Sequence, residues 1–156
     1  TMLHVCAEYN CRPLFEWLVS DHKGGPFRKN EAGETPLIIA AREGKIDIVK
    51  MYVEQYKDWE EYNLDHKMLD GWTAMSYAAM NGFCSVVDYL IKQGANVDSS
   101  DRLHRSALHW ACRFNNVKMT TLLLSKGIKI ETTDIEMQTP LTLAIRYNNK
   151  DCMEIL

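Results

Sequence analysis

The sequence predicts an all-α fold, a solenoid of stacked helix-turn-helix units joined by hairpin-like loops. A block of about ten residues recurs along the chain, a second apolar block follows each copy, and Gly or Asn separates the two. The copies begin at Thr1, Thr35, Thr73, Ser106 and Thr139, so successive starts differ by 34, 38, 33 and 33 residues. Because a fixed period of this length is typical of repeat architectures, we expect stacked units that share one continuous core.

The start of each unit has the features of a helix N-terminus. Thr35 is an N-cap residue type followed by Pro36 at the first helical position, and Thr139 with Pro140 repeats the pair. The other three copies also begin with Thr or Ser, so we expect the same cap there. Small residues follow at positions that let neighbouring helices approach closely: Ala40, Ala41, Ala78, Ala79, Ala111, Cys112 and Ala144.

The residues that separate the two blocks favour a left-handed helix end. Gly44 and Gly82 occupy this position in two units, and Asn10, Asn115 and Asn148 occupy it in the others. The second blocks PLFEWLV, IDIVKMYV, SVVDYLI, VKMTTLLL and DCMEIL then place apolar residues at helical spacing, which predicts a second helix with one buried side.

These blocks resemble the ankyrin repeat, and the T-P-L-x-x-A-A-x-x-G run at Thr35 is close to the family pattern. The resemblance covers the whole chain and implies one ankyrin-repeat domain over 1–156. Its repeats are expected at approximately 1–29, 30–67, 68–100, 101–133 and 134–156. Both terminal repeats are incomplete, so we expect the domain to be part of a longer chain.

The composition fits one intracellular globular domain. The 156 residues are 46% hydrophobic and 25% charged, which excludes a disordered chain. A net charge of −3 argues against nucleic-acid binding, and no apolar run is long enough to span a membrane. Five cysteines without a CxxC pair indicate reduced thiols, so we expect a location in the cytoplasm, with the nucleus as the alternative.

No catalytic or cofactor motif is present. The chain has no phosphate-binding glycine loop, no HExxH and no GxSxG, so we expect no enzyme activity, no cofactor and no metal. His109 and Cys112 have the spacing of two ligands on one helix. The resemblance implies instead that His109 forms hydrogen bonds within the inter-repeat turns, and His4 is interpreted in the same way.

Three segments depart from the repeat. The first junction, from Ser20 to Asn30, is expected to be an irregular loop. The second junction is longer by five residues and acidic, and two interpretations stay open. It is either an extended helix with a solvated end, or a contact element that presents Tyr56, Trp59 and Tyr62 to a partner. His104 and Met137 stand where other units have a turn glycine, so two hairpins should be tighter or slightly distorted.

The resemblance implies that partners meet the concave side, which consists of hairpin tips and the exposed flank of the first helices. Arginines and aromatic residues gather at these offsets, and such residues dominate interface hot spots. We therefore expect a basic and aromatic groove, centred on the third to fifth repeats, that binds an acidic or aromatic-containing protein segment. The candidate residues are Arg42, Trp72, Tyr77, Met80, Arg105, Trp110, Arg113, Phe114, Arg146 and Tyr147.

Two alternatives stay open for this groove. The arginines could be there only because they are soluble and compatible with a helix, and Trp110 could be packed between repeats. The function predicted first is a monomeric, non-catalytic protein-interaction scaffold. The second is a regulatory or targeting module of a larger enzyme, channel or ubiquitin-ligase-type protein, docked on its own neighbouring domain. Nucleic-acid or lipid binding through the arginines is less favoured, because the net charge is negative.

Overall fold

The computed structural model describes residues 1–20 and 25–156. The helices of this part are short and come in pairs, which confirms the predicted all-α class. They are α1 (Met2–Tyr9), α2 (Arg12–Ser20), α3 (Pro36–Arg42), α4 (Ile46–Tyr56), α5 (Ala74–Met80), α6 (Cys84–Lys92), α7 (Ala107–Arg113), α8 (Val117–Ser125), α9 (Pro140–Arg146) and α10 (Lys150–Ile155). Within the described residues, β pairing is limited to one isolated bridge between Ser100 and Ser106.

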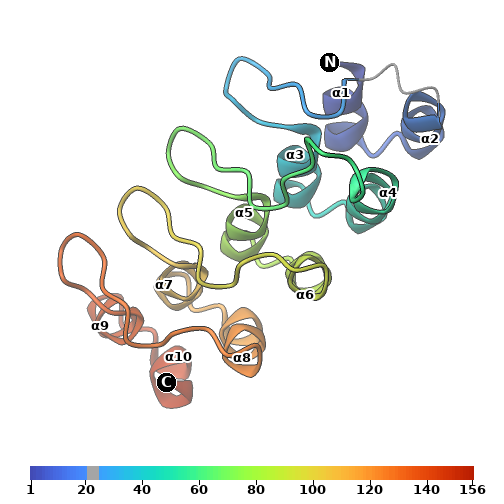
Figure 1. Cartoon of the computed structure of the whole chain (residues 1–156). Coiled ribbons are helices and arrows are strands. Elements are labelled where there is room, and N and C mark those ends of the chain that lie inside the picture. The colour runs from blue at the N-terminus through green and yellow to red at the C-terminus, as the bar shows by residue number, and fades with distance from the viewer. Residues whose placement is uncertain (21–24) are drawn as a thin grey trace.

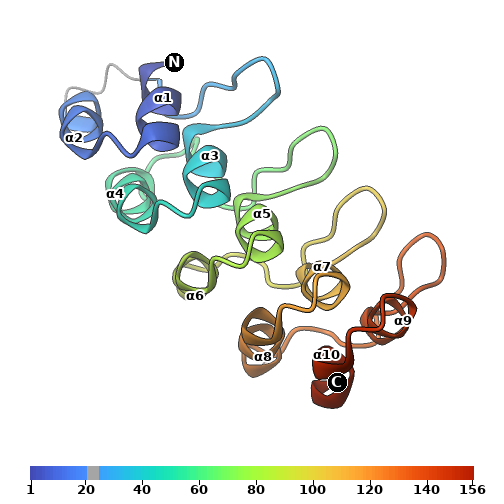
Figure 2. The same cartoon turned by 180° about the vertical axis from the view of Figure 1, so that it is seen from behind.

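The helix pairs stack into two parallel rows. The odd-numbered helices form one row and the even-numbered helices the other, while loops project beyond the odd row (Figure 1 and Figure 2). Each odd helix contacts the odd helices before and after it, and α4, α6 and α8 behave in the same way in the second row. We call the loops that precede α3, α5, α7 and α9 the fingers.

Helices α3, α5 and α9 begin at the predicted caps, whereas the hydroxyls of Thr1 and Ser106 contact the Nδ1 atoms of His4 and His109 at 2.7 and 2.9 Å. The Thr35 hydroxyl oxygen accepts a hydrogen bond from the backbone N–H of Ile38 at 3.4 Å. Thr73 and Thr139 accept the equivalent bonds from the third helical residue at 3.1 Å and 3.2 Å. Each of these bonds satisfies a backbone donor that has no partner within its own helix.

The left-handed helix ends are also confirmed. Gly44 and Gly82 have φ of 67° and 80°, and Asn10, Asn115 and Asn148 have φ of 56°, 52° and 55°. Asn is tolerated at this backbone conformation because its short polar side chain can bond locally.

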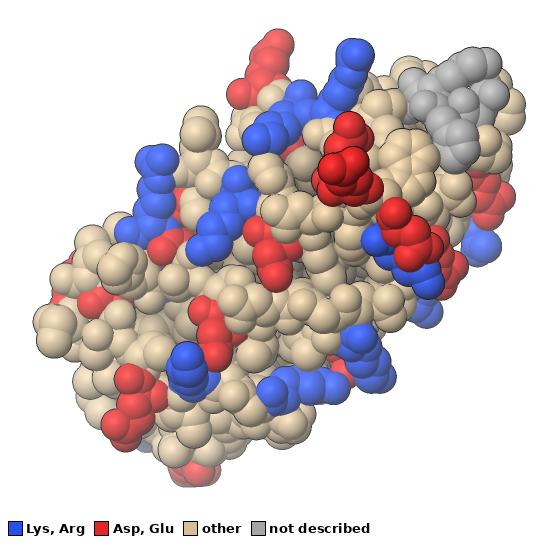
Figure 3. Space-filling model, in the orientation of Figure 1, with Lys and Arg blue, Asp and Glu red and all other residues tan. Residues whose placement is uncertain are grey.

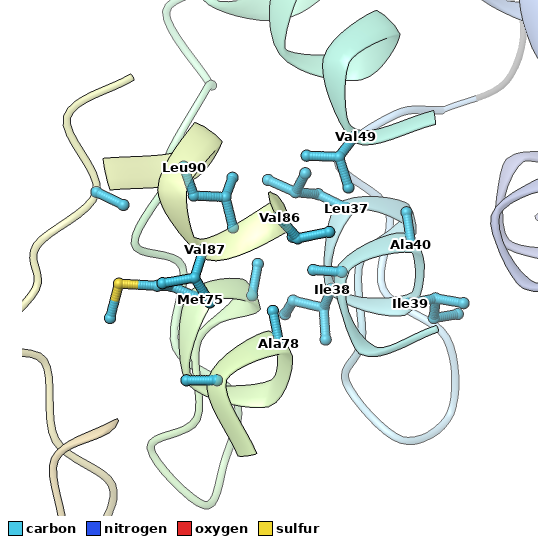
Figure 4. Packing of buried hydrophobic residues seen from close by; sticks show 14 of the residues in the cluster. Leu37, Ile38, Ile39, Ala40, Val49, Met75, Ala78, Val86, Val87 and Leu90 are labelled. Atoms are coloured by element: carbon cyan, nitrogen blue, oxygen red, sulfur yellow. The ribbon is translucent and has the colours of Figure 1, made fainter. Parts of the chain in front are cut away.

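A single core runs through the stack between the two rows. Figure 4 shows side chains of neighbouring repeats meeting in one packed layer, among them Ile38 of α3, Ala78 of α5 and Val86 of α6. The small residues predicted to allow close helix approach are essentially fully buried. No repeat could bury this surface alone, so each depends on its neighbours.

The finger turns without glycine keep the same architecture. His104 and Met137 have φ of 59° and 60°, against 82° and 85° at Gly33 and Gly71. All four residues donate the same turn hydrogen bond, at 2.9 to 3.0 Å. The predicted distortion is therefore confined to a modest change in φ, and these hairpins are not tighter. A carboxylate holds each of the two turns, because Asp101 and Asp134 accept two backbone N–H bonds at 2.8 to 2.9 Å.

The two irregular junctions follow different courses. In the first, residues 21–24 lie outside the described residues, and the rest turns at Gly25 through an Arg28 N–H to Gly25 oxygen bond of 3.1 Å. In the second, α4 ends at Tyr56 and only two residues of the insertion extend it relative to α6 and α8. Successive turns at Tyr56 and Trp59 then accommodate the remainder. The extended-helix interpretation is therefore right only in small part.

The aromatic residues of the second junction mostly face inward. Tyr56 is fully buried, which contradicts the interpretation that it faces a partner. Its ring contacts Phe27 edge-on at 5.6 Å between centroids, and Trp59 packs on Tyr56 at 5.2 Å. Burial raises the pKa of Tyr56 and raises that of Tyr62 to about 12. The longer junction therefore extends the core of the stack.

Candidate functional site

An aromatic row crosses the third and fourth repeats on the finger side of the odd helices. Trp72, at the base of the second finger, lies 4.8 Å from the Tyr77 ring and 5.0 Å from the Trp110 ring. Trp110 in turn stacks on Phe114 at 6.1 Å with an interplanar angle of 17°. We call Tyr77, Trp72, Trp110 and Phe114 the aromatic row. The structure thus brings together four of the candidate residues predicted from the sequence.

Packing between repeats fixes the inner part of this row. Trp72 is nearly buried, and Trp110 is half-buried with its indole N–H donated to Asp101 Oδ2 at 3.1 Å. The interpretation that Trp110 packs between repeats is therefore supported. The outer end of the row is open, because Phe114 is 56% exposed and Tyr147 is 43% exposed.

Arg113 joins the row to Tyr147 of the next repeat. Its guanidinium carbon lies 5.3 Å from the Trp110 ring, 5.8 Å from Phe114 and 5.2 Å from Tyr147. These are cation–π distances, so three rings orient one positive charge. Within residues 1–20 and 25–156, no carboxylate forms an ion pair with Arg113.

The other candidate arginines are engaged within the chain. Arg105 donates from Nε to the buried Asp134 Oδ2 at 3.0 Å and lies 5.5 Å from the Trp110 ring. Burial alone would raise the pKa of Asp134, but hydrogen bonds from the Gln138 backbone and from Arg105 lower it below its ordinary value. Arg42 pairs with Glu34 and Glu43.

Arg146, at the far end, bonds the exposed Glu136 at 3.3 Å. Within the described residues, intramolecular carboxylates therefore pair with three of the four candidate arginines, which reduces the free positive charge of the predicted groove. The last candidate, Met80, is half-buried on α5. The groove is aromatic, and of the four candidate arginines only Arg113 has no carboxylate partner among the described residues.

The finger tips carry apolar residues that the sequence reasoning missed. Leu69 is 76% exposed and Met137 is 77% exposed, and Ile135 is also exposed. The sequence did hold a signal for these exposed tips, because apolar residues stand at turn positions shortly before the cap residues Thr73 and Thr139. Two backbone bonds join the last three fingers, from Arg102 N–H to Asp70 oxygen at 2.9 Å and from Ile135 N–H to Leu103 oxygen at 3.0 Å. These three tips consequently present their apolar residues along one edge.

His109 and His4 are structural. His109 Nε2 donates to the Gln138 carbonyl oxygen at 3.1 Å, and Nδ1 accepts from the Ser106 backbone N–H at 3.1 Å. His4 contacts the Glu34 carbonyl oxygen at 2.9 Å in the same way. Burial lowers the pKa of both imidazoles, and burial raises the pKa of the Cys112 thiol to about 12. Neither histidine has the free nitrogen that a metal ligand needs.

Two other kinds of site find no support in the part of the chain that the structure describes. No group of three or more ligating side chains could hold a metal ion there, and no helix there combines the length and apolar character that a membrane-spanning segment needs. Acidic and basic side chains are interspersed on the face seen in Figure 3. That face therefore shows no single-sign patch of the kind that binds nucleic acid.

Comparison with known proteins gives consistent matches along the chain. The family model described as "Ankyrin repeats (3 copies)" matches residues 3–101, 52–134 and 101–156. Neurogenic locus notch homolog protein 1 of Homo sapiens is 30% identical over 144 residues, which cover 92% of this chain and 5% of that protein. Inversin of Canis lupus familiaris is 34% identical over 86 residues, 55% of this chain and 8% of that protein. The chain thus spans less than a tenth of these relatives.

Proposed function

The chain belongs to the ankyrin-repeat family, whose repeats are generally protein–protein interaction modules and typically non-catalytic, and from this we propose that it is a monomeric scaffold that binds a partner protein segment on its finger side. The binding surface is the open end of the aromatic row, with Arg113, Phe114 and Tyr147 as its anchors. Arg42, Arg105 and Arg146 shape this surface through their internal ion pairs rather than by meeting the partner. The protein acts in the cytoplasm or the nucleus.

One observation carries this proposal, the position of Arg113. A guanidinium held by three rings offers planar donors at a fixed place, and it has no carboxylate of its own within the described residues. A partner carboxylate can therefore bind without first displacing an internal ion pair. Because the rings already hold the side chain, little conformational entropy is lost when the partner binds.

The surroundings of Arg113 define the rest of the partner. Phe114 and Tyr147 expose large ring surfaces beside the guanidinium, so an apolar or aromatic residue next to the partner's carboxylate would be buried there. The partner is accordingly a segment with Asp or Glu adjacent to an apolar or aromatic residue. The exposed apolar tips at Leu69 and Met137 extend the same surface.

A random peptide display selection tests this function. We expect the 156-residue chain to enrich peptides with an acidic residue beside an aromatic or apolar one. Binding of a selected peptide, measured by fluorescence anisotropy, should weaken about tenfold or more in Arg113→Gln, because a charge-assisted bond at a desolvated site is lost. Lys118→Gln is the matched control, since Lys118 is an exposed cation on α8 in the other row.

Two results would overturn the proposal. Peptides enriched without any acidic residue would remove the role of Arg113. Equal weakening in Arg113→Gln and Lys118→Gln would mean that peptide binding depends on general charge. Circular dichroism on both variants confirms that each remains folded.

A second candidate function rests on the small share of the relatives that the chain covers. Because it spans 5% to 8% of the relatives named above, the same surface could dock on a neighbouring domain of a larger enzyme, channel or ubiquitin-ligase-type protein. In that case a domain placed in cis would compete with the selected peptides. Peptide affinity that is unchanged in a longer chain would argue against this alternative.

A further inference from the structure

A cavity of about 240 Å³ lies where the two irregular junctions meet, away from the aromatic row. Phe27 and Lys29 of the first junction form one side of it, and Glu61, Leu64 and His66 of the second junction form the other. The N-terminal turn of α3 closes the floor. Such a cavity is large enough for a molecule of roughly ten non-hydrogen atoms, below the size of most drug-like ligands.

The second junction also holds polar atoms that the chain leaves unsatisfied. The hydroxyls of Tyr56 and Tyr62 and the Nε2 atom of His66 are buried, and no described residue gives them a hydrogen bond. Buried polar atoms are rarely without a partner, and three of them within one junction call for an explanation. His66 lines the cavity directly, so its nitrogen is the one that a molecule in the cavity could reach.

The charged groups at the cavity are exposed and of opposite sign. Lys29 and Glu61 both line it, and neither forms an ion pair with a described residue. Lys29 lies close enough to His66 that, after burial, its charge is the second cause lowering the pKa of that imidazole. A neutral imidazole can donate from Nε2, so Lys29 and His66 together suit a carboxylate.

Glu61 supplies the opposite charge, which suits an ammonium group. The Phe27 ring and the Leu64 side chain are partly exposed at the same cavity and suit an aliphatic or aromatic body. One small molecule that satisfies all of these groups is an amino acid zwitterion.

We propose that this cavity binds a free amino acid with an apolar side chain. Its carboxylate lies at Lys29 and His66, its ammonium group at Glu61, and its side chain against Phe27 and Leu64. The insertion of the second junction is then a ligand-binding element added to the repeat stack, and it works independently of partner binding on the aromatic row.

Titration of the ¹⁵N-labelled 156-residue chain with three probes tests this site by NMR. L-leucine carries both charges, 4-methylpentanoate has the same body without the ammonium group, and 3-methylbutylamine lacks the carboxylate. We expect saturable shifts at residues 61–66 with L-leucine, with a Kd of about 1 mM for so small a ligand. The other two probes should bind at least tenfold more weakly.

Substitutions identify the groups involved. Lys29→Met and Glu61→Gln should each weaken L-leucine binding about tenfold. Lys57→Met should leave it unchanged, because Lys57 is an exposed cation of the same junction that does not line the cavity. Arg113→Gln should also leave it unchanged, which separates this site from the proposed partner surface.

Several outcomes would overturn the proposal. These are no saturable shift with L-leucine, equal affinity for 4-methylpentanoate, or equal loss of binding in Lys57→Met. The first would mean that solvent alone satisfies His66, the second that Glu61 plays no part, and the third that binding follows general charge. Circular dichroism and a thermal melt on each variant exclude loss of fold as the cause.

Discussion

Arginines at positions that look alike in the sequence differ in their ion pairing in the structure. Arg105 and Arg113 both flank the Trp110 ring, but Arg105 is neutralised by the buried Asp134 and Arg113 has no such partner among the described residues. Asp134 lies 29 positions after Arg105, in the next finger. No local pattern links the two, so the sequence alone predicted four equivalent arginines, of which only Arg113 has no carboxylate partner among the described residues.

The histidine of the fourth repeat illustrates the opposite case. The role of His109 in the inter-repeat turn was implied by the resemblance to ankyrin repeats and is confirmed by its two hydrogen bonds. Ser106 is three residues before it, and Gln138 precedes the next cap. The family pattern thus predicted a hydrogen bond between residues 29 positions apart. The type of residue at the arginine positions did not predict which of them would have a carboxylate partner.

Buried neutral histidines should make stability depend on pH. Burial lowers the pKa of His109 and His4 in the folded state, so the unfolded chain binds protons more readily. The stability that the two neutral imidazoles contribute is fully present above the unfolded pKa of about 6.5 and is lost as the pH falls below it. The urea concentration at the unfolding midpoint should therefore decrease as the pH is lowered from 7.5 to 5.5.

The His109→Gln variant is the control for this effect. Gln can keep a donor near the Gln138 carbonyl but does not titrate. We expect a lower midpoint at pH 7.5 and a shallower decline towards pH 5.5 than in the parent chain. An equally steep decline in His109→Gln would show that another group is responsible.

Helices and fingers were predicted best where their ends depend on local chemistry. Thr caps, Pro36 and the left-handed Asn residues all act within four residues of themselves, and each was predicted. The second junction was not, because its course depends on Phe27, more than 20 positions earlier in the chain, which packs against Tyr56. Long-range packing of this kind has no periodic signal in the sequence.

The fingers differ in how closely they approach one another. A Cβ atom added to Gly71 would lie 2.7 Å from the Arg102 backbone nitrogen, whereas one added to Gly33 would meet nothing within 4 Å. The same difference is seen in the hydrogen bonds, because no backbone bond joins the first two fingers among the described residues. The second finger therefore sits tightly against the third.

Two glycine substitutions separate close approach from backbone strain. Both glycines have positive φ, so Gly33→Ala should cost about 1 kcal/mol through strain alone. Gly71→Ala should cost about 1 kcal/mol or more beyond that, because backbone atoms of the third finger must also move. Urea denaturation of the two variants measures the difference. Equal costs would show that the fingers can separate without penalty.

The molecule as a whole is a chain of neighbour contacts, since each helix pair packs only on those beside it. A residue at the same place in the repeat is therefore buried or exposed according to whether a further pair stacks on it. Leu108 in the fourth repeat is 0% exposed, whereas the equivalent Leu141 in the fifth is 39% exposed. The two occupy the same position after the cap residue.

Leu108 and Leu141 allow a prediction of how much the neighbouring repeat adds to the free energy of unfolding. Leu108→Ala should cost about 2–5 kcal/mol, as expected for a buried leucine that leaves a cavity. Leu141→Ala should cost under about 1 kcal/mol, because part of its surface already meets solvent. Equal free energies of unfolding in the two variants would contradict burial by the neighbouring repeat as the cause.

The bonds that join the last three fingers have a consequence for selectivity. Because the Arg102 to Asp70 and Ile135 to Leu103 bonds hold those fingers in register, Leu69 and Met137 stand at set separations from the rings at Phe114 and Tyr147. A partner that uses both a tip and a ring must then carry its own two anchors at a matching interval. Inserting a single residue between those anchors would abolish recognition while leaving the composition of the partner almost unchanged.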